Sequence, residues 1–332
     1  MRLTEALGIS QGEVVALVGA GGKTAALYRL AAEAARGGSK VIATTTTHML
    51  PPPPEWPLIL AAHVPESLQA TRRALAIHGH AFVASSRHTD GRLLGIACED
   101  VATLAPLADL TLVEADGARS RWVKAPASHE PAIPPAATLI VPLVGLQALG
   151  NPIDSLHVHR PEHVARLLGI ETSTPLTPAL LARLLQHERG ALCGAPARAR
   201  VVPLLNQADT PRERLAGREI AVIVLRASHR IGRVVIASLR TGVECECWQP
   251  TAVIVLAAGA SRRFGRLKQA EFWRGRTLLQ RAVAAALSSL ASIVVVVLGY
   301  EAERLQAFLP RESERLRLVV NSAWPEGRAS SL

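Results

Sequence analysis

Short runs of aliphatic residues alternate along the chain with longer segments in which apolar residues repeat at helical spacing. The aliphatic runs are continuous, which is typical of strands buried on both faces of a parallel sheet. Because strands that alternate with helices form βαβ units, the pattern predicts an α/β domain with a mostly parallel sheet over residues 1–240. The expected strands occupy residues 13–19, 40–46, 109–115, 138–144, 218–225 and 233–239.

A second strand, turn and helix begin after residue 250. The run 251–265 enters a glycine-rich turn, and a helical segment then leads to the strand 292–300. The polar segment 241–250 ends in proline, so we expect it to be a linker. Only about 80 residues follow it, whereas an α/β nucleotide-binding domain usually needs more than about 100. We therefore predict that 251–332 is an incomplete Rossmann-like domain.

Composition excludes several classes of protein. The 332 residues are 49% hydrophobic and 19% charged, which excludes a disordered chain. Lys and Arg number 37 against 27 Asp and Glu, giving a net charge of +10, but this charge is scattered and lacks a stacking aromatic motif. The four cysteines form no CxxC pair, which argues against a disulfide framework or a zinc site. No apolar run approaches the ~18 residues of a membrane span. We expect a cytoplasmic protein without nucleic-acid or membrane partners.

The first glycine-rich loop follows the strand 13–19 and leads into a helix. Glycines let backbone amides approach phosphate oxygens, a lysine neutralises phosphate charge, and a threonine hydroxyl binds Mg²⁺. The full motif has glycine where Leu17 stands, so a tight turn without a ligand stays open as an alternative. A dinucleotide fingerprint would need glycine in place of Thr24, and we exclude it. The sequence thus predicts a P-loop-type nucleotide site formed by Gly19, Gly21, Gly22, Lys23 and Thr24.

Two carboxylates lie at the end of the expected strand 109–115, at the edge of the sheet where this loop lies. They are Glu114 and Asp116, and carboxylates at this place suit Mg²⁺ and an attacking water. We expect Thr24 and Asp116 to hold Mg²⁺ and Glu114 to orient the water. Glu114 and Asp116 are therefore the candidate catalytic residues of the first domain.

A later strand ends in Asn206, with Asp209 three residues on. This spacing resembles the N-K-x-D segment in which GTPases read guanine, but Gln207 stands where that segment has lysine. Asn206 and Asp209 are thus candidate nucleotide contacts, with an ordinary polar loop as the alternative. CTP, ATP and GTP all remain candidates.

Between these sites, the segments 115–131 and 156–164 are rich in arginine, lysine and histidine. Such a lining can bind a polyanion, for example a phosphorylated pterin or a selenium or molybdenum species. We therefore expect an anionic small-molecule partner, with solvated surface histidines as the alternative.

Several segments together resemble one family. VALVGAGGKTAALYRLA, VIATTTTHML, LVEADGARSRWVKAPASHEPAIP, VGLQALGNPI and HVHRPEHV are similar to the YqeC family of selenium cofactor biosynthesis proteins, which is associated with selenium-dependent molybdenum hydroxylases. The resemblance covers roughly residues 5–240. It implies a nucleotide-binding accessory protein, with a molybdenum hydroxylase as a candidate partner.

The second glycine-rich loop, LAAGASRRFGRLK, follows the buried strand that begins at residue 251. Its small residues would let a base and a triphosphate lie against the backbone, and its basic residues would neutralise phosphates and favour departure of pyrophosphate. Lys268 is the candidate catalytic residue. The expected nucleotide contacts are Leu256, Ala257, Ala258, Gly259, Ser261, Arg262 and Arg263.

This loop, together with GRTLLQRAV, VVVVLGY and VVNSAWPEGRASSL, resembles the MobA/MocA-like nucleotidyltransferases, which include molybdenum cofactor cytidylyltransferase. In that family a Mg²⁺-holding aspartate follows the segment that ends here at Leu332. The resemblance therefore implies a nucleotidyltransferase domain that binds nucleotide but is a weak or inactive transferase.

These features predict a nucleotide-binding accessory protein in the maturation of a molybdenum- or selenium-containing pterin cofactor. Its expected cofactors are Mg²⁺ and a nucleoside triphosphate, and its expected partner is a molybdopterin-type cofactor or another anionic small molecule. Two alternatives stay open: a molybdenum cofactor cytidylyltransferase regulated by its first domain, and a non-catalytic carrier or chaperone that loads a molybdenum hydroxylase.

Overall fold

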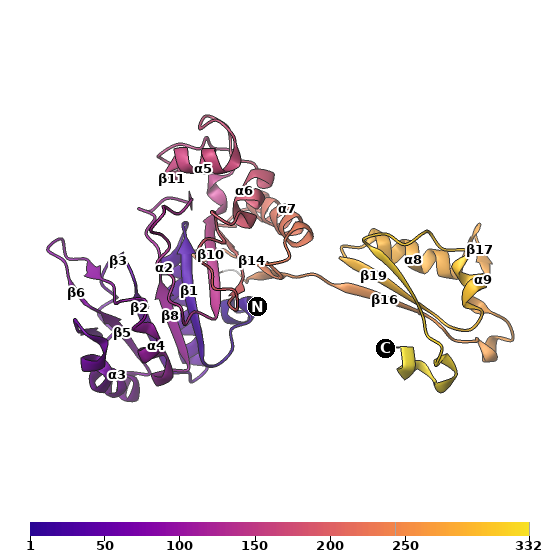
Figure 1. The fold of residues 1–332 in the computed structure, drawn as a ribbon, viewed down its shortest axis with the longest axis horizontal. Helices are drawn as coiled ribbons and strands as arrows, with labels where there is room; N and C mark the ends of the chain where they lie inside the picture. The colour runs from indigo at the N-terminus through magenta and orange to yellow at the C-terminus, as the bar shows by residue number, and fades with distance from the viewer. Residues whose placement is uncertain (243, 332) are drawn as a thin grey trace. The chain divides into compact units, whose positions relative to one another are not determined.

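The computed structural model describes residues 1–242 and 244–331 and divides into two compact units, Met1–Gln249 and Pro250–Leu332 (Figure 1). Each unit has its own sheet and its own hydrophobic core. Both features are expected of separate domains. We call them unit 1 and unit 2.

A ten-stranded sheet forms the centre of unit 1. Strand β1 (Glu13–Gly19) lies in its middle, paired in parallel with β8 (Leu110–Glu114) on one side and β10 (Leu139–Gly145) on the other. The order is β15-β14-β13-β10-β1-β8-β2-β5-β4, with β12 beside β10, and only the pairing of β14 with β15 is antiparallel. The remaining strands are β2 (Val41–Thr45), β4 (Leu58–Leu60), β5 (His80–Ala84), β12 (Arg200–Val201), β13 (Leu204–Asn206), β14 (Val234–Ile236) and β15 (Glu246–Trp248).

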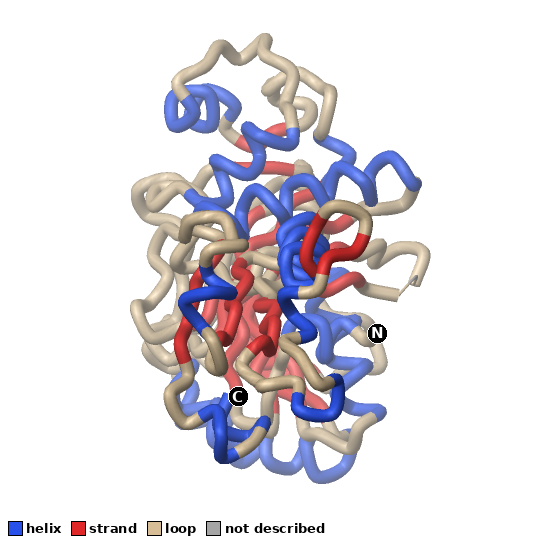
Figure 2. The backbone as a smooth tube through the Cα atoms, turned by 90° about the vertical axis from the view of Figure 1, so that its right-hand side faces the viewer, coloured by secondary structure: helices blue, strands red, loops and turns tan. Residues whose placement is uncertain are grey.

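Helices cover both faces of this sheet (Figure 2). Alternate residues of a strand point to opposite faces. Val14, Ala16 and Val18 of β1 thus pack into a core with α3 to α7, whereas Val15 and Leu17 pack into a core with α1 and α2. The helices are α1 (Leu3–Leu7), α2 (Lys23–Arg36), α3 (Val64–His78), α4 (Val101–Leu104), α5 (Pro161–Leu168), α6 (Pro178–Gln186) and α7 (Pro211–Ala227).

Two small groups of strands lie outside the large sheet. The antiparallel group has the order β3-β7-β6, and β9 pairs in parallel with β11. The second pairing matters for the site because it joins two distant loops. The strands are β3 (His48–Met49), β6 (Ser86–Arg87), β7 (Leu93–Leu94), β9 (Val123–Lys124) and β11 (Val158–His159).

The expectation of a strand at 218–225 is wrong, because these residues lie within α7. The Thr210 hydroxyl accepts the Glu213 N–H while the Glu213 carboxylate accepts the Thr210 N–H, and this capping box starts the helix. The buried positions Ile220, Ala221 and Val224 follow helical spacing. A short apolar run does not by itself distinguish a buried helix from a strand.

The segment 241–250 also differs from the expected linker. It contains β15, which pairs with β14 at the edge of the sheet, so that unit 1 extends to Gln249. Arg218 of α7 donates two hydrogen bonds to Glu246, at 2.9 and 2.8 Å, and ties this strand to the helix layer. An edge strand with polar side chains has a composition similar to that of a linker, so sequence alone did not distinguish the two.

Unit 2 is a smaller α/β unit with a three-stranded parallel sheet in the order β16-β19-β20. Helix α8 packs on this sheet, and its Leu279 and Val283 share a core with Val294 and Val296. An α/β fold with mostly parallel sheets is therefore confirmed. The elements are β16 (Ala252–Ala257), β17 (Phe272–Trp273), β18 (Arg276–Thr277), α8 (Leu278–Ser288), β19 (Ile293–Leu298), α9 (Ala302–Gln306) and β20 (Leu316–Val320). Among the described residues of both units, no helix is long and apolar enough to cross a membrane.

Replacement of Leu17 by alanine tests the central position of β1. Leu17 is fully buried, so we expect the Leu17→Ala change to lower the free energy of unfolding by about 2–5 kcal/mol through lost burial and a residual cavity. Urea denaturation of the full chain, followed by circular dichroism, measures this loss. Leu215→Ala on α7 is the matched control, because Leu215 is 68% exposed and its loss should stay within about 0.5 kcal/mol. Equal losses in the two variants would contradict this arrangement.

Candidate functional site

The loops at the carboxyl end of the unit 1 sheet meet beside β1. The chain proceeds from β1 to β2 on one side, whereas β10 lies on the other, so the strand order reverses at β1. Open α/β sheets bind ligands at such a point. A cleft of about 1210 Å³ opens here, and its lining includes Gly21, Gly22, the start of α2, the end of β8 and the segment 117–122.

The loop between β1 and α2, residues 19–22 and here called the glycine loop, packs directly against β10. Gly19 and Gly21 have φ angles of +83° and +85°, and a Cβ at either would collide with the backbone of Leu143 or Gly145. The Gly19 N–H donates to Asp116 Oδ2 at 3.0 Å, and the Gly21 N–H donates to the Arg121 carbonyl at 3.0 Å. These two amides therefore bond within the protein and hold the loop in place, whereas we expected Gly19 and Gly21 to contact a nucleotide.

The amides that remain for a ligand lie at the start of α2. In residues 1–242 and 244–331, the N–H groups of Gly22, Lys23 and Thr24 donate to no protein acceptor. Unpaired amides at a helix start, together with the helix dipole, attract anions. Lys23 is buried, with its Nζ donating to the Gly19 carbonyl at 2.7 Å. Burial lowers the pKa of Lys23, and the charges of Glu114 and Asp116 offset part of that shift. The backbone amides available to an anion are therefore those of Gly22, Lys23 and Thr24, here called the Gly22–Thr24 cradle.

The two expected carboxylates occupy different surroundings. Glu114 lines the cleft and accepts a hydrogen bond from Thr24 Oγ1 at 2.8 Å. Asp116 is 1% exposed and is held by Lys124 Nζ and the Gly19 N–H. Burial raises the pKa of both carboxyls, opposed by Lys23 at Glu114 and by Lys124 at Asp116. The structure brings Glu114 to Thr24, rather than the Asp116 that we expected there.

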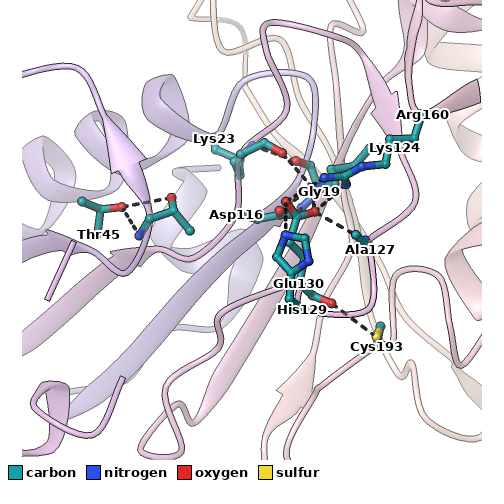
Figure 3. Close-up of polar contacts among 12 residues, drawn as sticks. Gly19, Lys23, Thr45, Asp116, Lys124, Ala127, His129, Glu130, Arg160 and Cys193 are labelled. Atoms are coloured by element: carbon teal, nitrogen blue, oxygen red, sulfur yellow. Dashed lines mark hydrogen bonds and ion pairs between the residues drawn. The ribbon is translucent and has the colours of Figure 1, made fainter. Parts of the chain in front are cut away.

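A network of charges continues from Asp116 toward the cleft (Figure 3). Lys124 Nζ also donates to Glu130 Oε2 at 2.7 Å, and Arg160 binds Glu130 with two hydrogen bonds of 2.6 and 3.0 Å. Burial alone would raise the pKa of Glu130, but these bonds outweigh it and lower the pKa to about 2. His159 lies beside them, and burial together with the Arg160 charge lowers its pKa to about 4.

Lys124, Glu130 and Arg160 lie in the segments 115–131 and 156–164 that we expected to bind an anion, but they are not among the catalytic, nucleotide or metal residues that we predicted. One signal in the sequence pointed to Lys124. The chain has only four lysines, of which Lys23 and Lys124 are each 6% exposed. A buried lysine needs a carboxylate partner. Across the described chain, no cluster of three or more His, Cys, Asp or Glu side chains could hold a metal ion.

Asn206 and Asp209 are engaged within the protein. Asn206 Nδ2 donates to the Gly21 carbonyl at 2.7 Å, and its Oδ1 accepts the Leu239 N–H at 3.0 Å. Asp209 accepts hydrogen bonds from Ser238 and, at 2.9 Å, from Arg240. Neither lines the cleft, whereas Gln207 does. Asn206 therefore supports the glycine loop and does not occupy a position that would read a base.

The second expected loop borders a cavity of about 640 Å³ in unit 2. All the expected contacts line it except Ala257, which is buried in the core. Gln269, which our assignment missed, accepts from Ser261 Oγ at 2.8 Å and donates to the Gly259 carbonyl at 2.7 Å. This side chain fixes the shape of the loop. The expected residues in the lining are Leu256, Ala258, Gly259, Ser261, Arg262, Arg263 and Lys268.

Comparisons with known proteins agree with this division. The YqeC protein family matches residues 15–162, and the MobA-like NTP transferase domain matches residues 253–332. "Uncharacterized protein YqeC" of Escherichia coli (strain K12) is 31% identical over 212 residues, which is 62% of this chain and 80% of that protein. Nicotine blue oxidoreductase of Paenarthrobacter nicotinovorans is 42% identical over 80 residues, 24% of this chain and 38% of that protein. The chain thus spans little more than a third of the second relative. No solved structure matches the chain.

The low pKa of His159 predicts a pH dependence of stability. Its pKa is about 4 in the folded protein against 6.5 for the free side chain, so the unfolded chain takes up a proton first as the pH falls. Stability from this group is therefore present above about pH 6.5 and is lost between pH 6.5 and 4. We expect the unfolding free energy of wild type to fall more between pH 7 and 5 than that of His159→Gln, by at most about 1.4 kcal/mol per pH unit.

Urea denaturation of the full chain at pH 5, 6 and 7 measures this difference. Glu130 contributes little to this difference, because its pKa is lowered from 4.5 to about 2, so its contribution to stability is lost mainly between pH 4.5 and 2, below the range measured. The exposed His229→Gln is the control and should keep the wild-type slope. An identical slope for His159→Gln and wild type would contradict the burial of His159 among cations.

Proposed function

Because the chain belongs to the YqeC family and carries a MobA-like NTP transferase domain, we propose that it is a nucleotide-binding accessory protein in the maturation of a molybdenum- or selenium-containing pterin cofactor. The observation that carries the proposal is the group of unpaired amides at Gly22–Thr24, which lies beside Lys23 at the carboxyl end of β1. This arrangement suits the phosphates of a nucleoside triphosphate. On this proposal the glycine loop acts as a P-loop.

The residues around Thr24 also fit Mg²⁺. The Thr24 hydroxyl and the Glu114 carboxylate lie 2.8 Å apart at the cleft, and both are oxygen ligands of the kind that Mg²⁺ prefers. When bound, Mg²⁺ would neutralise charge on the phosphate oxygens. Lys23 then binds the phosphates as well, and Asp116 fixes the Gly19 amide and the Lys124 ammonium. We therefore propose Glu114 in place of Asp116 as the partner of Thr24 toward the metal.

We propose a second nucleotide site in the 640 Å³ cavity of unit 2. Ala258 and Gly259 leave room for a base and sugar, and Arg262, Arg263 and Lys268 supply positive charge for a triphosphate. The Gln269 hydrogen bonds hold the loop in a shape that keeps this cavity open. A nucleotidyltransferase that uses CTP, ATP or GTP on a pterin-type substrate fits these features.

Unit 2 also supports the second candidate, a molybdenum cofactor cytidylyltransferase regulated by unit 1. The basic lining of its cavity favours this candidate over a carrier without catalysis. The activity in the name of nicotine blue oxidoreductase belongs to that protein, of which this chain matches 38%.

Lys23→Met tests the site in unit 1. Loss of a charged donor to phosphate removes about 1.5–3 kcal/mol, so we expect the Kd for the preferred nucleotide to rise roughly tenfold to a hundredfold. Calorimetric titration of the full chain with ATP, GTP and CTP in the presence of Mg²⁺ measures the change. Lys40→Met is the matched control, because Lys40 is exposed outside the cleft. An unchanged Kd in Lys23→Met would remove the glycine loop from nucleotide binding.

Lys268→Ala tests the site in unit 2. We expect this change to weaken CTP binding about tenfold, with Arg311→Ala, an exposed cation away from the cavity, leaving it unchanged. Combining Lys268→Ala with Lys23→Met separates the two sites in the same titration. Transfer assays with CTP, Mg²⁺ and molybdopterin then distinguish the candidates. Cytidylyl transfer that survives Lys23→Met but not Lys268→Ala would favour the cytidylyltransferase.

A further inference from the structure

We propose that the cleft of unit 1 has a second anion subsite, separate from the Gly22–Thr24 cradle and formed by Arg119, Arg121 and Arg160. It would take the phosphate, or a comparable oxyanion, of a small-molecule substrate bound together with the nucleotide. The inference rests on the proposed function in one respect, because it assigns the cradle to the nucleotide. A cleft of about 1210 Å³ has room for both, since a pocket for one small ligand occupies about 300–1,000 Å³.

The first observation is an excess of positive charge on the cleft wall. Among the described residues of the lining, lysine and arginine contribute five side chains, whereas Glu114 and Glu130 contribute the two carboxylates. Glu114 accepts from Thr24, and Glu130 is neutralised by Lys124 and Arg160. The exposed Arg119 forms no hydrogen bond or ion pair with any residue that the structure describes.

The pKa of His159 reflects the same positive charges. This residue lines the same wall, and the causes of its low pKa are burial followed by the charges of Arg160 and Lys124, with a smaller contribution from Arg119. Glu130 opposes the shift without cancelling it. The local potential therefore stays positive although a carboxylate lies within the network, and such a potential favours an anion.

The second observation is the scaffold that brings these arginines together. Strand β9 pairs with β11 in the register Lys124 to His159, which joins the segment after β8 to the segment before α5. Arg121 Nε donates to the Ser155 carbonyl at 2.5 Å, so its side chain is anchored across the same junction. Arg160 is fixed by its two bonds to Glu130. Anchored guanidinium groups bind an oxyanion with little loss of side-chain freedom.

The third observation is backbone strain at the same place. Arg119, Ser120 and Arg160 have φ angles of +46°, +59° and +62°, although none of them is glycine. Such conformations cost of order 1–3 kcal/mol each and cluster at binding sites, where the surrounding structure maintains them. All three residues line the cleft. The surrounding structure therefore holds the loops that carry Arg119 and Arg160 in backbone conformations that would be unfavourable in an isolated chain.

The proposed subsite adjoins the phosphate cradle. The Arg121 carbonyl accepts the Gly21 N–H at 3.0 Å, so the segment with Arg119 and Arg121 begins beside the glycine loop. The side chains that define the two sites nevertheless differ, since the cradle uses amides at the start of α2 and Lys23. Each site can therefore be removed without the other.

Calorimetry on the full chain tests this separation. The protein is first saturated with a non-hydrolysable analogue of its preferred nucleotide and is then titrated with pyrophosphate. We expect pyrophosphate to bind the saturated protein, and Arg119→Gln to raise its Kd about tenfold, equivalent to about 1.4 kcal/mol. The nucleotide Kd should stay within about twofold of wild type. Arg72→Gln is the matched control, because Arg72 is exposed on α3 outside the cleft.

The titrations distinguish failure of the proposed subsite from failure of the proposed function. Pyrophosphate bound in unit 2 does not depend on Arg119, so the difference between wild type and Arg119→Gln reports unit 1 alone. Absence of pyrophosphate binding to the saturated protein, equal weakening of nucleotide and pyrophosphate in Arg119→Gln, or an equal effect of Arg72→Gln would each overturn the subsite. Arg119-dependent binding of pyrophosphate by a protein that binds no nucleotide would reject the proposed function and keep the subsite.

Discussion

The close packing of the glycine loop against β10 is the constraint on which the site depends. Positive φ angles at Gly19 and Gly21, and the absence of Cβ atoms there, allow the loop to touch the backbone of Leu143 and Gly145. The loop amides then pair with Asp116 and with the Arg121 carbonyl. Because these bonds fix the loop from the protein side, α2 begins at a defined place and its first unpaired amides face the cleft. Any residue larger than glycine would push the helix start away from this position.

The same contact explains why a chain of charges lies beneath the cleft. Asp116 accepts the Gly19 N–H with one oxygen, so its other oxygen needs a donor in a region that excludes water, and Lys124 supplies it. Lys124 in turn requires Glu130, and Glu130 requires Arg160. Removing Lys124 would leave the buried Asp116 carboxylate without a charged partner. The network thus connects the glycine loop, through Asp116 and Lys124, to the wall of the cleft that β9 and β11 form.

Short sequence motifs predicted those parts of the site that neighbouring residues in the chain determine. The run into Gly19, the glycines, Lys23 and Thr24 predicted the strand, turn and helix that the structure has, and Glu114 does reach Thr24. The family resemblance is confirmed by the comparisons.

The predictions that differ from the structure concern residues whose partners lie far along the chain. Asp116 pairs with Lys124, while Thr24 pairs with Glu114, and the pairing of β13 with β10 places Asn206 where it bonds to Gly21. No spacing rule encodes such contacts, and the apolar run 218–225 likewise becomes helical through a cap and through packing.

The two glycine-rich loops differ in how they are held, and this bears on how each unit can respond to a ligand. In unit 1 backbone bonds and the buried pair of Asp116 with Lys124 fix the loop without a ligand. In unit 2 the Gln269 side chain and a few backbone bonds, such as that from the Tyr300 N–H to the Ala258 carbonyl at 2.9 Å, shape the loop, and no buried ion pair among the described residues holds it. Ile254 and Val319 of its sheet are also 48% and 47% exposed, although parallel sheets are normally covered on both faces. A ligand that binds only the folded form stabilises it by mass action. Bound nucleotide should therefore reduce the mobility of the unit 2 loop more than that of the glycine loop in unit 1. Fewer protein contacts hold the unit 2 loop when no ligand is bound.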